Sequence, residues 1–235
     1  MTVLFQIIFK QWKHLVTNIP RKLEPLSHKL KVPELRQHVS QFLYEQKHPN
    51  SPIPVELIPR EELPQHNGKI YLYPSAVAVF RAPSDLCGTH GMRSERIRSV
   101  SSWRNGHPRR DCVYIEHNAE LHGFRGLYVA QVESFMKIVH DRKAYPCALV
   151  SWFSTIGDVP CPETGMWIVK RDLDDRRNKV MSIIHIDAIL RGAHLIGVAA
   201  NRLVPRDLTC TDSLNAFKTF FVNKYIDYHA HEIAV

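Results

Sequence analysis

The apolar residues of the first fifty positions recur at the spacing of an α-helix. One stripe, which Pro20 ends, consists of Leu4, Ile8, Trp12, Leu15 and Ile19. A second stripe begins at Pro33, a residue suited to the first turn of a helix, and consists of Leu35, Val39, Phe42 and Leu43. The pattern therefore predicts two amphipathic helices that each turn one face towards a core.

A proline-rich stretch follows, and after it the pattern changes to short apolar runs separated by turn residues. Residues 48–68 contain five prolines and predict an extended linker. Residues 83–110 are predicted to be a loop. Strands are predicted at Lys69–Phe80, Asp111–Glu116, Leu127–Val139, Ala144–Phe153, Met166–Lys170 and Val180–Ile186, with a short one near His194–Ala199.

The stretch from Tyr145 to Val169 shows this pattern most clearly. Two aromatic-rich apolar runs flank a loop that carries Gly157, Pro160, Pro162 and Gly165, as expected for two strands with an ordered connection. Several short strands with turn-rich spacers are typical of a small barrel or sandwich. We therefore expect an α+β fold built on a partly open β-barrel of SH3-like size.

The last 25 residues are predicted to form one helix. Thr211 or Asp212 would cap it, and its packed face would consist of Leu214, Phe217, Phe221, Tyr225 and Tyr228. The expected organisation is a helical segment over 1–47, a linker over 48–68, a β-rich barrel-like domain over 69–210, and a packed C-terminal helix over 211–235.

The charge of the chain is uneven. The formal net charge is +8, and residues 1–117 hold 17 Lys and Arg against 10 Asp and Glu. An apolar content of 44% in 235 residues is sufficient for a folded core. The five cysteines form no Cys-x-x-Cys pair, so free thiols in a reducing compartment are expected. Since neither a signal peptide nor a membrane-spanning run is recognisable, we expect an intracellular protein, nuclear or cytoplasmic, without membrane attachment.

The strongest concentration of positive charge is the segment RSERIRSVSSWRNGHPRR at 93–110, in which six arginines accompany a single acid, Glu95. Arginine binds phosphates with two parallel hydrogen bonds, and tryptophan can stack on a base or sugar. The candidate nucleic-acid-binding residues are Arg93, Arg96, Arg98, Trp103, Arg104, Arg109 and Arg110. The alternative is a solvated loop whose arginines pair with nearby acids.

No residue pattern predicts catalysis, a metal or a cofactor. Gly-x-Ser-x-Gly, Gly-x-Gly-x-x-Gly and Walker motifs are absent from the sequence. His229 and His231 are two positions apart, so on a helix they would not share a face. His185 and Asp187 would share a face on a strand, but two ligands do not make a metal site. Asp187 is instead expected to pair with Arg191 and to order a turn between strands.

Blocks of the sequence resemble the C-terminal region of Plavaka-type transposases, which belong to cut-and-paste DNA transposons of basidiomycete fungi in the CACTA superfamily. The resemblance covers about residues 35–235. Its blocks are FRAPSDLCGTHGMRSERIRSVSSWRNGHPRRDCVYI (80–115), GFRGLYVAQVESFMKI (123–138), YPCALVSWFSTIGDVPCPETGMWIVKRD (145–172), SIIHIDAILRGAHLIGV (182–198) and DSLNAFKTFFVNKYIDYHAHEIAV (212–235).

The resemblance implies that an RNase H-like catalytic core with acidic metal ligands precedes this region in full-length members, so no catalytic residue is assigned here. It also implies that residues 120–205 match the small β-barrel that follows the core in related plant transposases. The expected function is that of a non-catalytic accessory region of a transposon-derived protein, which binds DNA, transposase subunits or another protein. A protein-interaction barrel of the chromatin-reader kind is the alternative, and a stand-alone metal-dependent nuclease ranks last.

For the chromatin-reader alternative, the residues to examine are Tyr128, Tyr145, Trp152 and Trp167. An exposed cluster among them would favour an aromatic cage, and burial of all four would remove it.

Overall fold

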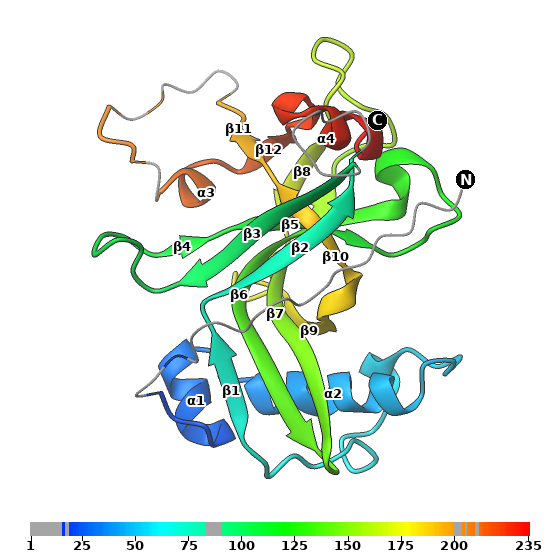
Figure 1. Cartoon of the computed structure of the whole chain (residues 1–235), viewed down its shortest axis with the longest axis vertical. Coiled ribbons are helices and arrows are strands. Elements are labelled where there is room, and N and C mark those ends of the chain that lie inside the picture. The colour runs from blue at the N-terminus through cyan, green and yellow to red at the C-terminus, as the bar shows by residue number, and fades with distance from the viewer. Residues whose placement is uncertain (1–15, 17–18, 83–90, 200–203, 205, 210–211) are drawn as a thin grey trace.

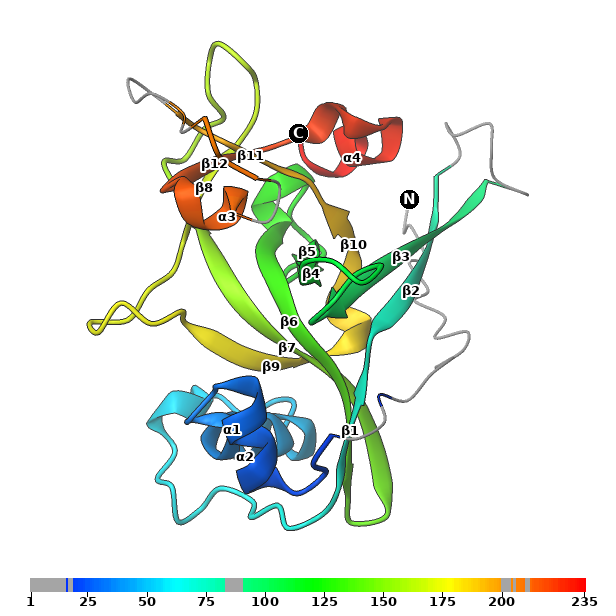
Figure 2. The ribbon, with the colours of Figure 1, turned by 90° about the vertical axis from the view of Figure 1, so that its left-hand side faces the viewer.

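The fold is α+β, and its largest unit is an antiparallel sheet that curves into a partly open barrel (Figures 1 and 2). This computed structural model describes residues 16, 19–82, 91–199, 204, 206–209 and 212–235. Within that part, nine strands form the sheet in the order β10-β5-β6-β7-β8-β12-β11, while β1 adds to β6 and β9 to β7. The strands are β1 (Ile70–Tyr73), β5 (Cys112–Glu116), β6 (Leu127–His140), β7 (Lys143–Thr155), β8 (Ile168–Arg171), β9 (Met181–His185), β10 (Ile189–Ala193), β11 (Leu195–Gly197) and β12 (Thr219–Val222). The expected barrel is thereby confirmed.

The long hairpin of β6 and β7 is the centre of the sheet. Its two-residue turn at Asp141 and Arg142 has φ values of 49° and 64°. Positive φ at both positions is what a type I′ turn requires, and that turn matches the twist of paired strands. Both faces of the hairpin are buried, since Met136 and Cys147 belong to one hydrophobic cluster and Phe135 and Ala148 to another. Burial on both faces explains why the two strands are apolar almost throughout.

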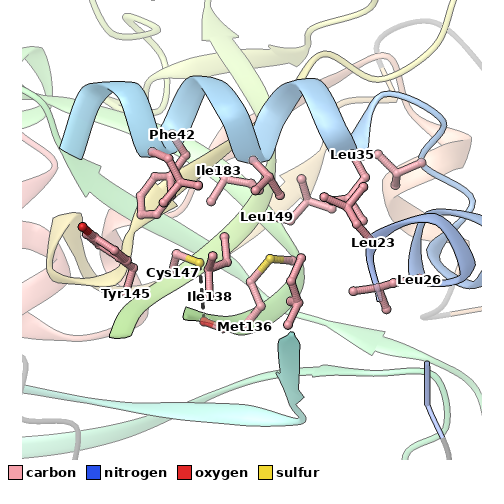
Figure 3. Close-up of a cluster of buried hydrophobic side chains, with 14 of the residues drawn as sticks. Leu23, Leu26, Leu35, Phe42, Met136, Ile138, Tyr145, Cys147, Leu149 and Ile183 are labelled. Atoms are coloured by element: carbon pink, nitrogen blue, oxygen red, sulfur yellow. Dashed lines mark hydrogen bonds between the residues drawn. The ribbon is translucent and has the colours of Figure 1, made fainter. Parts of the chain in front are cut away.

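Two N-terminal helices cover one face of this hairpin. They are α1 (Leu23–Leu30) and α2 (Leu35–Lys47), and α2 corresponds to the helix predicted from Pro33. Figure 3 shows Leu35 and Phe42 of α2 pointing towards Leu149 and Ile138 of the sheet. The first predicted helix lies almost wholly outside the described residues.

The proline-rich segment contains a 3₁₀ turn, η1 (Val55–Leu57), and buries Val55, Leu63 and His66. Because α1 and α2 share a hydrophobic cluster with β1, β6, β7 and β9, the helices do not form a core of their own. The sequence led us to expect a linker between a helical segment and the barrel. Instead, the helices and the barrel share one hydrophobic cluster.

A second, three-stranded sheet packs against the barrel. It consists of β2 (Ser75–Arg81), β3 (Met92–Val100) and β4 (Arg109–Arg110), in the order β2-β3-β4. Ala78, Phe80 and Ile97 turn into the cluster that also contains Phe135 of β6. The prediction of a loop over 83–110 is thus wrong for residues 92–100 and 109–110, which form β3 and β4, whereas residues 101–108 contain no strand.

The prediction that the C-terminal segment forms one helix is wrong. It contains α3 (Ser213–Ala216), then strand β12, the 3₁₀ turn η4 (Lys224–Ile226) and α4 (Tyr228–Ile233). Phe220 and Val222 alternate with half-buried neighbours and are buried in the barrel, between β8 and β11. The period-two burial of this short run overrides the helical spacing of its aromatic residues.

The packed C-terminal helix is therefore confined to α4. The side chain of Asp227 caps α4 by accepting a hydrogen bond from the backbone N–H of Ala230 (2.7 Å). The carbonyl of Val235 accepts a hydrogen bond from the N–H of Phe124 (3.1 Å), beside η2 (Gly123–Gly126). Gly123 has a φ of +66°, and a side chain on it would collide with that carbonyl. Through these contacts the C-terminal end packs firmly on the barrel.

The remaining elements agree with the strand predictions at their centres. The region around Ser182–Leu195 contains the 3₁₀ turn η3 (Ile186–Ala188) followed by β10. Cys112 and Cys147 are free and buried, and burial raises the pKa of the Cys112 thiol to about 12. Cys161 is free and half-buried, whereas Cys87 and Cys210 lie outside the described residues.

Replacing Leu35 with Ala tests whether helices and barrel share one core. The side chain of Leu35 is fully buried, so its loss is expected to cost about 2–5 kcal/mol of the free energy of unfolding. Helical circular dichroism and the fluorescence of the barrel tryptophans should shift together in urea. The control is Leu57→Ala, since Leu57 is 71% exposed. A tryptophan transition left at the wild-type midpoint would contradict the shared core.

Candidate nucleic-acid interface

The alternation of β3 divides the arginines of 93–110 between two faces of the small sheet. Successive side chains of a strand point to opposite faces. Arg96 and Arg98 therefore share the outer face, while Arg93 and Glu95 share the inner face with the buried Ile97. In β4, Arg109 pairs with Val100 and so lies on the outer face, whereas Arg110 pairs with Ser99 and lies on the inner face.

The outer face carries one further arginine that the sequence analysis did not select. Arg81 at the end of β2 pairs with Met92, and its exposed side chain follows Val77 and Val79 along the same face. The only signal for it is the alternation of β2, which can be used once β2 is known to pair with β3. We call Arg81, Arg96, Arg98, Arg104 and Arg109, together with Trp103, the outer arginine face.

Three arginines of this face lie around the aromatic ring of Trp103. The guanidinium carbons of Arg98, Arg104 and Arg109 lie 4.4, 5.4 and 5.6 Å from the centre of its ring. At these distances each cation is attracted by the electron-rich ring. The ring is half-buried by its neighbours, so it acts as the support on which the cations are arranged.

A tight turn holds Trp103 and Arg104 in place. The N–H of Gly106 donates to the carbonyl of Trp103 and the N–H of Trp103 donates to the carbonyl of His107, both at 2.9 Å. Arg104 and Asn105 have φ values of 52° and 61°, which is the requirement of a type I′ turn. The arginine-rich segment is thus a β3–β4 hairpin that ends in a defined tip.

Negative charge compensates only part of the outer arginine face. Asp111 accepts a hydrogen bond from Nε of Arg109 (2.8 Å) and another from the backbone N–H of Arg98 (2.9 Å). No acidic side chain within the described residues forms an ion pair with Arg81, Arg96, Arg98 or Arg104. Partial burial and then the neighbouring cations, Arg109 foremost, lower the pKa of the Arg98 guanidinium, against the opposing effect of Asp111. Electrostatic repulsion between these neighbouring positive charges therefore costs free energy, and a bound anion would reduce that cost.

The inner-face arginines are neutralised instead. Arg93 lies 3.8 Å from a carboxylate oxygen of Asp227, and Nε of Arg110 lies 3.3 Å from a carboxylate oxygen of Glu133. Of the seven sequence-predicted residues, five thus gather on the outer face, and Arg93 and Arg110 do not. Two interpretations of this segment were open from the sequence, nucleic-acid binding and pairing with nearby acids. The inner face fits the second, and the outer face leaves the first open.

A buried ionic cluster fixes β3 to the C-terminal segment. Arg191, whose side chain is 4% exposed, donates two hydrogen bonds to Asp227 at 2.8 and 2.6 Å. Its Nε lies 3.6 Å from a carboxylate oxygen of Glu95 on β3, and its guanidinium lies over the ring of Phe80. The ring of His229 stacks on the ring of Phe80, with 4.5 Å between the two ring centres.

The expected pair of Asp187 and Arg191 does not form, since Asp187 contacts His185. A register shift between Ile189 and Arg191 in β10 accompanies the burial of Arg191 against Asp227.

Charge and burial shift the pKa values of this cluster. Burial would raise the pKa of Asp227, but hydrogen bonds from Arg191 and from the Ala230 N–H hold it at about 2. Burial, and then the charge of Arg191, lower the pKa of His229 to about 4. His229 is therefore neutral at pH 7, and it does not share a site with His231, which lies beside Tyr225.

The four aromatic residues examined for a chromatin-reader cage divide into two pairs. Tyr145 and Trp167 are buried core residues, at 6% and 5% exposure. Tyr128 is 48% exposed, lies edge-on to the half-buried Trp152 at 5.9 Å and stacks on His117 at 4.1 Å. One exposed tyrosine remains, beside a half-buried tryptophan and a flanking histidine, which is less than an exposed cluster among the four.

Comparison with protein-family models, curated proteins and solved structures returned no match. Within the described ranges, no three histidine, cysteine, aspartate or glutamate side chains are arranged to hold a metal ion. A search of the same ranges for a helix long and apolar enough to cross a bilayer found none.

Acid is expected to destabilise the protein through His229. Its pKa is about 4 in the folded protein and about 6.5 when unfolded, so the contribution is complete above pH 6.5 and is lost as the pH falls towards 4. Between these pH values the free energy of unfolding should decrease by about 1–3 kcal/mol more in the wild type than in His229→Gln. Urea unfolding at pH 7, 5.5 and 4.5 measures this difference. Parallel pH profiles for the two proteins would refute the assignment.

Proposed function

We propose that this chain binds DNA through the outer arginine face and serves as a non-catalytic accessory region of a transposon-derived protein. The observation that supports binding is that Arg98 and Arg104 lie over the ring of Trp103, while neither they nor Arg96 on the same face form an ion pair with an acidic side chain of the described residues. The transposon context is supported by the sequence blocks that resemble Plavaka-type transposases. A location in the nucleus would follow from that context.

The chemistry of the face fits the phosphate backbone better than base edges. Guanidinium groups presented by a sheet and a short hairpin can contact consecutive phosphates, and such contacts carry no sequence information. Each neutralised phosphate releases condensed counterions, so affinity should fall steeply as salt rises. Four to five contacts predict a slope of about −4 for the logarithm of the association constant against that of salt.

Neutralising three of the arginines tests this proposal. The triple variant Arg96→Gln, Arg98→Gln and Arg104→Gln should bind a 20-base-pair duplex at least about 10-fold more weakly at 50 mM salt, with a shallower salt slope. Fluorescence anisotropy from 50 to 200 mM salt measures both quantities.

The matched control is the triple variant Arg125→Gln, Arg142→Gln and Arg176→Gln, which removes the same charge from exposed positions outside the sheet β2-β3-β4. Equal losses in the two variants would mean that net charge alone accounts for binding. The absence of salt-dependent binding by the wild type would refute the DNA proposal.

The exposed Tyr128, which lies beside the half-buried Trp152, favours a second candidate, recognition of a protein partner. An aromatic surface with a flanking histidine can contact a methylated lysine through cation–π attraction. Tyr128→Ala should then abolish binding of a trimethyl-lysine peptide and leave the duplex affinity unchanged. Peptide binding that is absent from the wild type, or unaffected by the substitution, would exclude this candidate.

A further inference from the structure

A cleft of about 670 Å³ lies on the inner side of the β3–β4 hairpin, opposite the outer arginine face. The end of α1 forms one wall, the hairpin forms another, and β6 and β7 form the floor. The volume lies within the range of ordinary ligand sites. Val16 and Ile19, from the segment before α1, also line the cleft, together with Lys29, Lys31, Ser101 and Met181.

A β-bulge places a carboxylate inside this cleft. In the register of β6 and β7, Val132 pairs with Val150 and Ser134 with Leu149, so Glu133 is the additional residue between them. Bulges redirect a side chain out of the regular alternation. The backbone carbonyl of Glu133 also accepts a hydrogen bond from Oγ of Ser99 (2.7 Å), which attaches the hairpin to the bulge.

The carboxylate of Glu133 is neutralised within the cleft. It accepts hydrogen bonds from Nζ of Lys179 (2.6 Å) and Oγ of Ser151 (3.0 Å), and it lies 3.3 Å from Nε of Arg110. Lys179 and Arg110 thus supply two positive charges for one negative charge.

Lys29 and Lys31 add two exposed ammonium groups at the end of α1. No acidic partner for either of them occurs among the described ion pairs. The cleft as a whole therefore has an excess of positive charge.

The lining of the cleft fits one unpaired nucleotide. The half-buried Val16, Ile19 and Met181 provide apolar surface for a base, the exposed Ser101 provides a hydroxyl group, and the two lysines provide charge for a phosphate. Proteins that recognise a base removed from its stack, or a base of a single strand, combine apolar contact to the base with positive charge for the backbone, and this lining offers both.

We propose that this cleft receives one unpaired nucleotide of a nucleic-acid strand whose neighbouring phosphates contact the outer arginine face. The two surfaces are the opposite faces of one hairpin, so a strand that crosses its edge at Ser101 and Ser102 reaches both. The proposal rests on the proposed function and adds a preference for single-stranded or distorted DNA over a regular duplex.

The test compares three probes of the same sequence: a regular duplex, the duplex with one unpaired nucleotide, and the single strand. The full chain should bind the second and third probes at least about 5-fold more tightly than the first. Ser101→Trp places an indole in the cleft from an exposed position without changing charge. It should abolish the preference and leave duplex affinity within about 2-fold of wild type. The matched control is Thr155→Trp, at an exposed site on β7.

A second variant tests the cleft without a bulky side chain, in case Ser101→Trp perturbs folding. Lys29→Gln with Lys31→Gln should lower affinity for the unpaired probes more than for the duplex. The control with the same loss of charge is Lys22→Gln with Lys69→Gln, both exposed.

Equal affinity of the wild type for all three probes, or a preference that survives both cleft variants, would overturn the cleft while leaving the arginine face intact. The absence of binding to every probe would overturn both proposals.

Discussion

The β6–β7 hairpin is the constraint on which the rest of this structure depends. β1, β5, β8 and β9 each pair with one of its two strands. Its two faces are buried by different partners, with the helices on one face and the small sheet on the other (Figure 2). A hairpin that is apolar on both faces cannot remain in water, so helices, barrel and small sheet must assemble around it. The outer arginine face is a consequence, because it is the side of the small sheet that this core does not need.

The distribution of charge follows the same division. Arginines that point towards the barrel form ion pairs with acidic side chains, as Arg191 does with Asp227 and Arg110 with Glu133. Breaking such pairs would leave a buried charge without compensation, which costs several kcal/mol. On the outer face only Arg109 has an acidic partner among the described residues, Asp111, whereas Arg98 and Arg104 lie over the ring of Trp103. The inner pairs therefore determine the position of β3, and its position determines how the outer cations are presented.

The sequence predicted the elements whose pattern is local and missed those whose pattern depends on distant partners. The strands at Leu127–Val139 and Ala144–Phe153 were predictable because their apolar runs are long. β3 was not, because its inner face holds Arg93 and Glu95, whose partners Asp227 and Arg191 lie far along the chain. β12 was missed for a related reason, since the neighbours that make Phe220 a strand residue are β8 and β11.

The candidate site shows the same limit. The arginine-rich segment was recognisable from composition, but only the pairing of β3 shows that Arg96 and Arg98 share a face and that Arg93 does not. Arg81 required the same knowledge.

Hydrogen–deuterium exchange with and without duplex DNA tests the central claim most directly. The account predicts slower exchange in peptides from 75–81 and 92–110, with no change in 143–155. Unchanged exchange in the small sheet, or protection centred on Tyr128 instead, would contradict it.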